Sequence, residues 1–235
     1  MFSKTINAVG VVHSPFKEKF AVPRQAKLVA DLISEIEMFP PYDDLNCFRG
    51  IENFSHLWLI FDFNLIEDHS FRPMVRPPRL GGNRRIGVFA TRSPFRPNNI
   101  GLSSVANRGV IRRNNKTILC VAGADLVDGT PIIDIKPYIR FTDAVECADS
   151  SYAQEEPGSA AVEFSPEALA FVNSLDPEKY PHFEEIVREI VSYDPRPAYK
   201  NKTDIHEYGF SFYDFNIRFR SDNPEHITVT QIRPQ

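Results

Sequence analysis

Two prolines separate a pair of short apolar runs in the middle of the chain, and this limits the folds that the sequence can adopt. Residues Ile86–Ala90 and Ile100–Val105 have the composition of β-strands, whereas residues 92–99 read Arg-Ser-Pro-Phe-Arg-Pro-Asn-Asn. Proline donates no hydrogen bond to a sheet ladder, so the two runs cannot form one continuous strand. Proline also lowers the entropy that a segment loses on folding. The sequence therefore predicts a stiff loop, here called the central loop, that displays guanidinium, amide and aromatic groups to a ligand with anionic and planar parts.

The charge around the central loop differs from that of the rest of the chain. Residues 69–124 contain ten arginines and one lysine but no Asp or Glu, a charge of +11, whereas the remaining residues carry −15. Arginine grips phosphate or carboxylate through a planar fork and stacks on bases, which lysine cannot do. A solvated basic face could carry the same charge, but the excess of arginine favours a surface that binds a polyanion, most simply nucleic acid.

Length and cysteine usage restrict the class of protein. The 235 residues suffice for one large or two small globular domains. We find no apolar run approaching the roughly 20 residues of a membrane helix, and the N-terminus lacks the apolar core of a signal peptide. Cys47, Cys120 and Cys147 are scattered, which argues against a disulfide framework and a zinc site. We therefore expect a cytoplasmic protein without metal or membrane contact.

Hydrophobic periodicity predicts mainly strands in the first 140 residues. We expect strands at Thr5–His13, Phe54–Phe63 and Ile132–Tyr138, and a hairpin over Val105–Val121 that turns at its two adjacent asparagines. Residues Ala26–Phe39 stay ambiguous, because their apolar positions have helical spacing while the part before Pro40 could be extended.

The last third of the chain has a different pattern. Residues 146–161 are polar, acidic and rich in small side chains, as in a linker. A helix is predicted to start after Ser165 and a second after Pro181. Phe210–Phe219 reads as one strand whose apolar phase slips near Tyr213-Asp214, which predicts a β-bulge, and Ile227–Ile232 pairs back on it. We expect a compact module with the element order ααββ.

Three strings carry a resemblance to a known family: SPFKEKFAVPRQ, GVFATRSPFRPNNIGLSSV and DLVDGTPIIDIKPYI. In that order they resemble the TsaA/YaeB-like family, whose characterised members include a bacterial methyltransferase that acts on threonylcarbamoyl-adenosine in tRNA. The resemblance runs from about Val9 to about Tyr138, with further matches in DPRPAY and DFNIRFR near the end.

The resemblance implies a fold and an activity. The fold would be mostly β with an α+β part: a small N-terminal β-barrel of non-Rossmann type at residues 1–145, a linker at 146–162 and a small α+β domain at 163–235. The barrel would bind S-adenosylmethionine, and the C-terminal domain would assist tRNA binding rather than hold the cofactor. The activity would be N6-methylation of threonylcarbamoyl-adenosine beside the anticodon, carried out by a homodimer.

The resemblance also assigns roles to residues. The residues that it implies for cofactor binding are Pro23, Arg24, Gln25, His56, Arg92, Leu102, Asp125, Val127, Asp128, Gly129 and Thr130. We expect the first three to converge with residues 125–130 on one pocket, although they lie about 100 positions apart. His56 could equally be structural, because it stands at the start of a buried strand.

Basic and aromatic residues in three places are candidates for tRNA contact. They are Arg76, Arg84, Arg85 and Arg96 in the central region, Arg112 and Arg113 in the hairpin, and Arg196 and Tyr199 in DPRPAY. We expect Arg92 to orient the cofactor or the modified base, in contrast to the hairpin arginines, which would touch phosphates.

The general base is left open by the sequence. Methyl transfer from a sulfonium depends mainly on in-line placement of the nucleophile, so the lack of a Ser-His-Asp or HExxH pattern is not informative. Arg92, Asp125 and Asp128 are candidates for catalysis, with Asp134 as a further carboxylate. Two other functions remain possible: a non-catalytic RNA-binding barrel, and an enzyme using another nucleotide. The second has no support from a GxxxxGK[ST] or a strand-linked GxGxxG motif.

Overall fold

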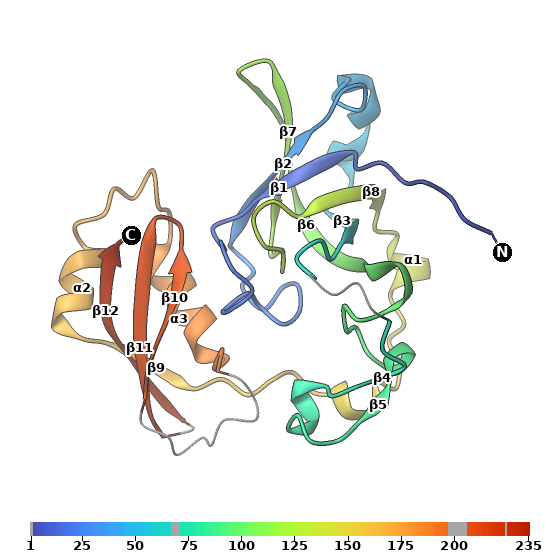
Figure 1. The fold of residues 1–235 in the computed structure, drawn as a ribbon. Helices are drawn as coiled ribbons and strands as arrows, with labels where there is room; N and C mark the ends of the chain where they lie inside the picture. Colours follow the sequence, from blue (N-terminus) through green and yellow to red (C-terminus); the bar gives the residue numbers. More distant parts are fainter. Residues whose placement is uncertain (1, 67–70, 197–205, 224) are drawn as a thin grey trace.

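Six antiparallel strands of the N-terminal half close into a β-barrel in the computed structural model, which describes residues 2–66, 71–196, 206–223 and 225–235 (Figure 1). The strands follow one another around the barrel as β1 (Gly10–His13), β2 (Ile33–Met38), β7 (Lys116–Ala122), β6 (Ile100–Arg113), β3 (His56–Asp62) and β8 (Pro131–Pro137), and β8 pairs with β1. A Rossmann domain has a parallel sheet, whereas each pairing in this barrel is antiparallel.

The barrel core follows from alternation along the strands. In β3, Leu57, Leu59 and Phe61 are buried, whereas the intervening His56 and Trp58 are only partly buried and face outward. Gly101 of β6 lies opposite Phe61, and a Cβ atom there would come within 2.3 Å of that ring. The predicted strand at 54–63 is therefore confirmed as β3, but it is buried on one face only.

Two predicted boundaries in this half change. The first strand begins at Gly10 rather than at Thr5. The ambiguous segment 26–39 contains turns followed by β2, so its extended part is the strand and its helical spacing produces no helix. The apolar spacing before β2 reflects packing rather than a helix, because Val29 and Leu32 are buried in the C-terminal core.

Residues 71–99 lie outside the barrel and contain little regular structure. Strands β4 (Met74–Val75) and β5 (Ile86–Gly87) form a two-stranded ribbon, and Val88–Ala90 form a 3-10 turn. The predicted strand at 86–90 is thus wrong in its second half. Further 3-10 turns are η1 (Leu45–Phe48), η2 (Ile51–Asn53), η3 (Pro78–Leu80), η5 (Pro97–Asn99) and η6 (Ser151–Ala153), and the short helix α1 spans Arg140–Asp143.

The predicted hairpin in the barrel is confirmed. Strands β6 and β7 are joined by Asn114 and Asn115, which have φ values of 51° and 63°. Asparagine tolerates this left-handed conformation better than most residues. The hairpin projects from the barrel at the top of Figure 1.

The C-terminal domain packs two helices on a four-stranded sheet. Its elements are β9 (Ala161–Phe164), α2 (Pro166–Val172), α3 (Phe183–Ser192), β10 (Glu207–Phe212), β11 (Phe215–Asn223) and β12 (His226–Pro234), and the sheet order is β10-β11-β12-β9. Ser165 caps α2, since its side chain accepts a hydrogen bond from the Ala168 amide. The predicted helix starts are confirmed.

Two predictions for this domain are wrong. Tyr213 and Asp214 form the turn of a hairpin between β10 and β11, with Phe212 paired to Phe215, so no bulge interrupts a single strand there. A tight turn places flanking residues on the same face, which gives the apolar pattern that we interpreted as a bulge. In addition, residues 161 and 162, which we assigned to the linker, belong to β9, which pairs in parallel with β12.

The chain between β1 and β2 connects the two halves. Phe16 bridges to Phe212, and the Tyr213 amide donates to the Pro15 carbonyl at 2.9 Å. Phe16 and Leu32 are fully buried in the same cluster as the α3 and β11 side chains. In Figure 1 this blue segment lies between the barrel and the C-terminal domain. Among the described residues, no helix has the length and apolar character needed to cross a membrane.

Candidate functional site

The two segments expected to share a ligand lie next to each other at one end of the barrel. The Lys27 amide donates to the Gly123 carbonyl at 2.9 Å, and the Gly123 amide donates to the Leu32 carbonyl at 3.0 Å. The Asp125 carboxylate accepts a hydrogen bond from the Ser103 hydroxyl at 2.6 Å, and the Ala26 amide lies close enough to lower its pKa. Barrel closure therefore brings residues 26 and 27 to residues 123–125, whereas convergence of residues 23–25 with residues 125–130 on one pocket stays a prediction.

Asp125 has an unusual environment for a carboxylate. Burial raises its pKa above the ordinary carboxyl value, while the hydrogen bond from Ser103 and the positive charge of Arg92 act in the opposite direction. Arg92 itself donates to the side-chain oxygen of Gln25 at 2.5 Å. The result is a polar cluster, here called the Asp125 cluster, with Asp125 on its anionic side and Arg92 on its cationic side. Ser103 and Gln25 are its other members.

Asp128 holds the turn that follows this cluster. Its carboxylate accepts from the Ser14 amide at 3.0 Å and from the Lys17 ammonium at 3.0 Å. The Gly129 amide donates to the Val12 carbonyl, and the buried Thr130 hydroxyl donates to the Val127 carbonyl at 2.7 Å. These contacts make Asp128 a structural anchor of the loop and leave Asp125 better placed as a candidate for chemistry. Asp134 lies further along β8 and pairs with Lys136 at 3.0 Å.

His56 lies on the outer barrel face near the chain that follows Gln25. Its ring centroid is 6.2 Å from that of Tyr138, and the Lys27 ammonium is 5.8 Å from the Tyr138 centroid. Burial lowers the pKa of His56, and the positive charges of Lys27 and Arg108 lower it further. Leu102 is 51% exposed on β6, where it pairs with Ile60 of β3.

Ser103 and Tyr138 were not among the predicted site residues. Ser103 is only 5% exposed, and alternation along β6 places it on the barrel's inner face opposite Leu59. A polar residue at a core position is a signal that the sequence contained. Tyr138 has no comparable signal, because only the packing of β8 against β3 brings it to His56.

The central loop is stabilised by its own polar groups. Arg96 donates to the carbonyls of Thr91 and Ser93 at 3.0 and 3.3 Å. The Asn99 side chain donates to the Pro94 carbonyl at 2.8 Å, and the Arg72 guanidinium lies 4.1 Å from the Phe95 ring centroid. These contacts stabilise the loop, with Arg92 at its start directed to Gln25 and Arg96 turned back on the loop backbone.

Besides Arg96, the arginines proposed to bind tRNA fall into three environments. Arg76, Arg84, Arg85 and Arg112 are exposed, and Arg112 donates to the Asn115 carbonyl at 2.9 Å. Arg113 is also exposed but forms a two-point ion pair with Glu35 at 2.8 and 3.0 Å. Arg196 is only 4% exposed, so its guanidinium does not face solvent. Tyr199 lies outside the described residues.

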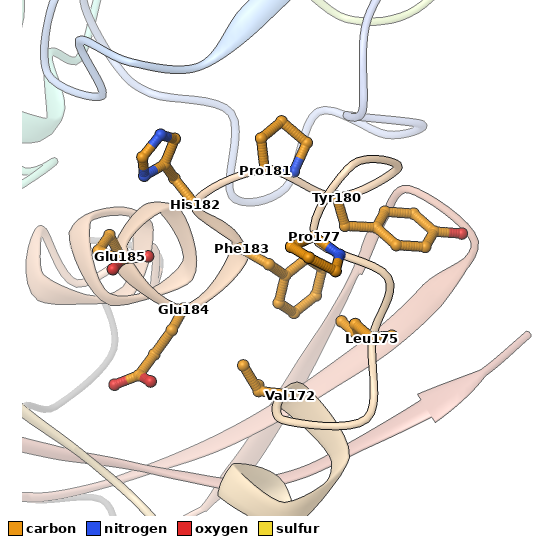
Figure 2. Close-up of a pocket in the computed structure, with 9 residues that line it drawn as sticks. All are labelled: Val172, Leu175, Pro177, Tyr180, Pro181, His182, Phe183, Glu184 and Glu185. Carbon is orange, nitrogen blue, oxygen red and sulfur yellow. The ribbon is translucent and has the colours of Figure 1, made fainter.

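Two cavities lie away from the Asp125 cluster. Figure 2 shows one of about 450 Å³ in the C-terminal domain, bordered by the end of α2, the connecting turn and the start of α3, with Tyr180 and Phe183 among its aromatic walls. The other, about 390 Å³, is lined by residues including Tyr42, Phe48 and Asp134. Neither is lined by a residue that we predicted to bind the cofactor.

Comparisons with known proteins match both halves of the chain. Residues 11–144 match the family described as the tRNA-methyltransferase O N-terminal domain, and residues 157–235 match the TrmO C-terminal domain. A relative from Escherichia coli strain K12, named tRNA (adenine(37)-N6)-methyltransferase, is 45% identical over 222 residues, which is 94% of each chain.

Two further similarities come from Pseudomonas aeruginosa. One relative is 37% identical over 228 residues, which is 97% of each chain, and its name contains the words S-adenosylmethionine-dependent methyltransferase. A crystal structure described as TrmO superposes with a TM-score of 0.82 at 31% identity and covers 99% of both chains.

Proposed function

This chain belongs to the tRNA-methyltransferase O family, and on that premise we propose that it transfers the methyl group of S-adenosylmethionine to N6 of adenosine 37 in tRNA. The observation that carries the proposal is the convergence of residues 23–27, Asp125 and Arg92, because those family-matching segments meet at one cluster. Relatives that span nearly the whole chain bear the corresponding names.

The side chains of this cluster suit the proposed cofactor. A carboxylate accepts hydrogen bonds from a ribose diol or an adenine amino group, and the Asp125 carboxylate lies beside Ala26. A cationic sulfonium is better tolerated beside a neutral imidazole than beside a protonated one, and the lowered pKa of His56 keeps its ring neutral at physiological pH. We assign Arg24, Gln25, His56, Leu102 and Asp125 to this site.

The bound cofactor would supply an electrophilic methyl group, so the protein must align the acceptor nitrogen and exclude water. In adenosine the N6 lone pair is delocalised into the ring, and a threonylcarbamoyl substituent withdraws it further. A group that accepts the N6 proton therefore lowers the barrier. Asp125 is the better candidate of the two loop carboxylates, because burial raises its pKa and thereby its proton affinity.

The substrate is threonylcarbamoyl-adenosine rather than plain adenosine in this proposal. Its carboxylate adds an anion beside the base, and a guanidinium recognises carboxylates by paired hydrogen bonds. Arg92 is the arginine of the central loop whose side chain is directed towards the Asp125 cluster. We assign it to the orientation of the modified base or the cofactor.

Two further features belong to the proposal. We infer a homodimer, because the exposed side chains of Phe71, Met74, Phe89 and Leu102 offer apolar area for a partner. We also infer a cytoplasmic location, since Cys47, Cys120 and Cys147 are all free thiols. Light scattering on a size-exclusion column tests the first inference.

The activity is tested in two steps. Calorimetric titration with S-adenosylmethionine should give saturable binding. Single-turnover transfer of a labelled methyl group should then occur on tRNA with threonylcarbamoyl-adenosine at position 37, and not on the same tRNA lacking that modification. Tight RNA binding without any cofactor binding would instead support a non-catalytic RNA-binding barrel.

A further inference from the structure

Arg196 is in the interior, although its motif made it a candidate for phosphate contact. Its side chain is 3% exposed. The guanidinium forms a two-point pair with Asp194, with Nε to Oδ1 at 2.7 Å and Nη2 to Oδ2 at 2.8 Å. The Cζ atom also lies 6.0 Å from the Tyr208 ring centroid. A buried, carboxylate-paired guanidinium is poorly placed to bind a tRNA phosphate.

The backbone that this ion pair shapes is in contact with the Pro23–Gln25 segment. Arg24 donates from Nη2 to the Arg196 carbonyl at 3.0 Å and to the Asp194 carbonyl at 3.5 Å. Asp194 has a φ of 47°, a left-handed conformation that a non-glycine residue holds only when its surroundings stabilise it. Two contacts stabilise this conformation of Asp194: its ion pair with the Arg196 guanidinium, and a hydrogen bond that its carboxylate accepts from the Arg196 amide at 3.3 Å.

The contact continues to the proposed cofactor cluster. Gln25 follows Arg24 directly and accepts a hydrogen bond from Arg92, and the next amide, that of Ala26, lies close enough to the Asp125 carboxylate to lower its pKa. The same stretch is fixed by packing on both sides, because Ala21 and Val29 are buried in the C-terminal core. The C-terminal domain thus supports the segment that leads to Asp125.

We propose that Arg196 is a positioning residue for the cofactor site. Its ion pair with Asp194 fixes the two backbone carbonyls that accept hydrogen bonds from Arg24. Arg24 in turn fixes the position of the next two residues, Gln25 and Ala26, beside Arg92 and Asp125. This inference rests on the proposed cofactor site. It changes the division of labour expected from the sequence, because the C-terminal domain then contributes to cofactor affinity in addition to any role with tRNA.

Calorimetric affinity for S-adenosylmethionine tests the proposal on the full-length protein. Arg196→Lys keeps the charge but loses the fork, so we expect about a 5- to 10-fold weaker affinity, in line with the loss of one charge-assisted contact. In kinetics this variant should raise the KM for the cofactor while kcat at saturation stays near the wild-type value. Arg218→Lys is the matched control, since Arg218 is an exposed arginine of the same domain, paired with Glu207 at 3.2 Å; it should leave both constants unchanged.

A second variant separates positioning from folding. Arg24 is exposed, so Arg24→Ala should fold normally and weaken cofactor affinity by about 10-fold. The double variant Arg24→Ala/Arg196→Lys should be no weaker than Arg24→Ala alone, because Arg196 acts through Arg24. If Arg196→Lys does not fold, Asp194→Asn tests the same ion pair from its other side: an unchanged cofactor affinity then overturns the proposal, and a weaker affinity at an unchanged melting temperature supports it.

Other outcomes distinguish the rival explanations. Additive losses in the double variant, or a lower melting temperature with unchanged cofactor affinity, would show that Arg196 is merely structural. A weaker tRNA affinity with a shallower salt dependence and unchanged cofactor affinity would make it a phosphate contact, and would also overturn the proposal. If the wild-type protein binds no S-adenosylmethionine, the proposed function itself fails, which is a different result.

Discussion

The central loop and the β6–β7 hairpin both carry arginines on the same basic stretch of sequence, yet the structure uses them differently. In the loop, Arg92 donates to Gln25 and Arg96 donates to two carbonyls of its own backbone. In the hairpin, Arg112 and Arg113 are exposed at the far end of β6. The charge of an arginine therefore does not indicate its task, whereas the groups that its guanidinium contacts do.

The largest effect that would sharpen this comparison is on catalysis. Arg92→Ala should lower the single-turnover rate of methylation by about 100-fold at saturating tRNA and cofactor, because it removes an oriented charged contact beside the reacting groups. The measurement is rapid-quench methyl transfer, with folding checked by thermal melting. A folded variant with the wild-type rate would place Arg92 outside the reaction.

Arg96→Ala should act on the loop itself. Without the Arg96 guanidinium, the carbonyls of Thr91 and Ser93 lose the hydrogen bonds that it donates to them. We expect the free energy of unfolding to fall by about 1–3 kcal/mol, the usual cost of unsatisfied, partly buried polar groups. Urea denaturation measures this change. A loss of tRNA affinity at unchanged stability would instead assign Arg96 to phosphate binding.

The hairpin should show the smaller, salt-dependent effect. Arg112→Ala and Arg113→Ala should each weaken tRNA binding a few-fold and reduce the slope of log affinity against log salt by about one counterion. Stability should change little, because even the ion pair of Arg113 with Glu35 is exposed. Filter binding at several salt concentrations measures the slope. Equal slopes for the variants and the wild type would remove the distinction between hairpin and loop.

The smallest effect concerns the carboxylate beside the loop. Since burial raises the pKa of Asp125 above its value in the unfolded chain, its stabilising contribution is complete below the unfolded pKa and is lost as pH rises through the folded pKa. Asparagine does not titrate, so the free energy of unfolding of Asp125→Asn should rise relative to the wild type as the pH increases above the ordinary Asp pKa of about 3.9.

Urea denaturation across that pH range measures the difference. Ser103→Ala provides a comparison in the same cluster, because it removes a hydrogen bond that lowers the Asp125 pKa. It should therefore make the pH dependence of stability steeper. A pH-independent difference between Asp125→Asn and the wild type would argue against a raised pKa.

Local patterns were informative wherever a residue's neighbours in sequence are also its neighbours in space. The strand at 54–63, the Asn114-Asn115 turn and the Ser165 cap depend on alternation, positive φ and a nearby amide, and all three are present. The slip at Tyr213-Asp214 shows the limit of such patterns. A hairpin turn and a bulge give the same apolar spacing, and only pairing with a neighbouring strand distinguishes them.

What the sequence determined by itself was the mostly β composition, the stiff central loop and the segregation of positive charge, because these depend on residue type and order. What only the tertiary structure decided was which groups meet. The closed barrel brings Asp125 to Ser103 and Ala26, and the packing of Phe16 and Leu32 into the C-terminal core brings Arg24 to Arg196. These contacts join residues 22 to 172 positions apart, and no local pattern encodes a partner at that distance.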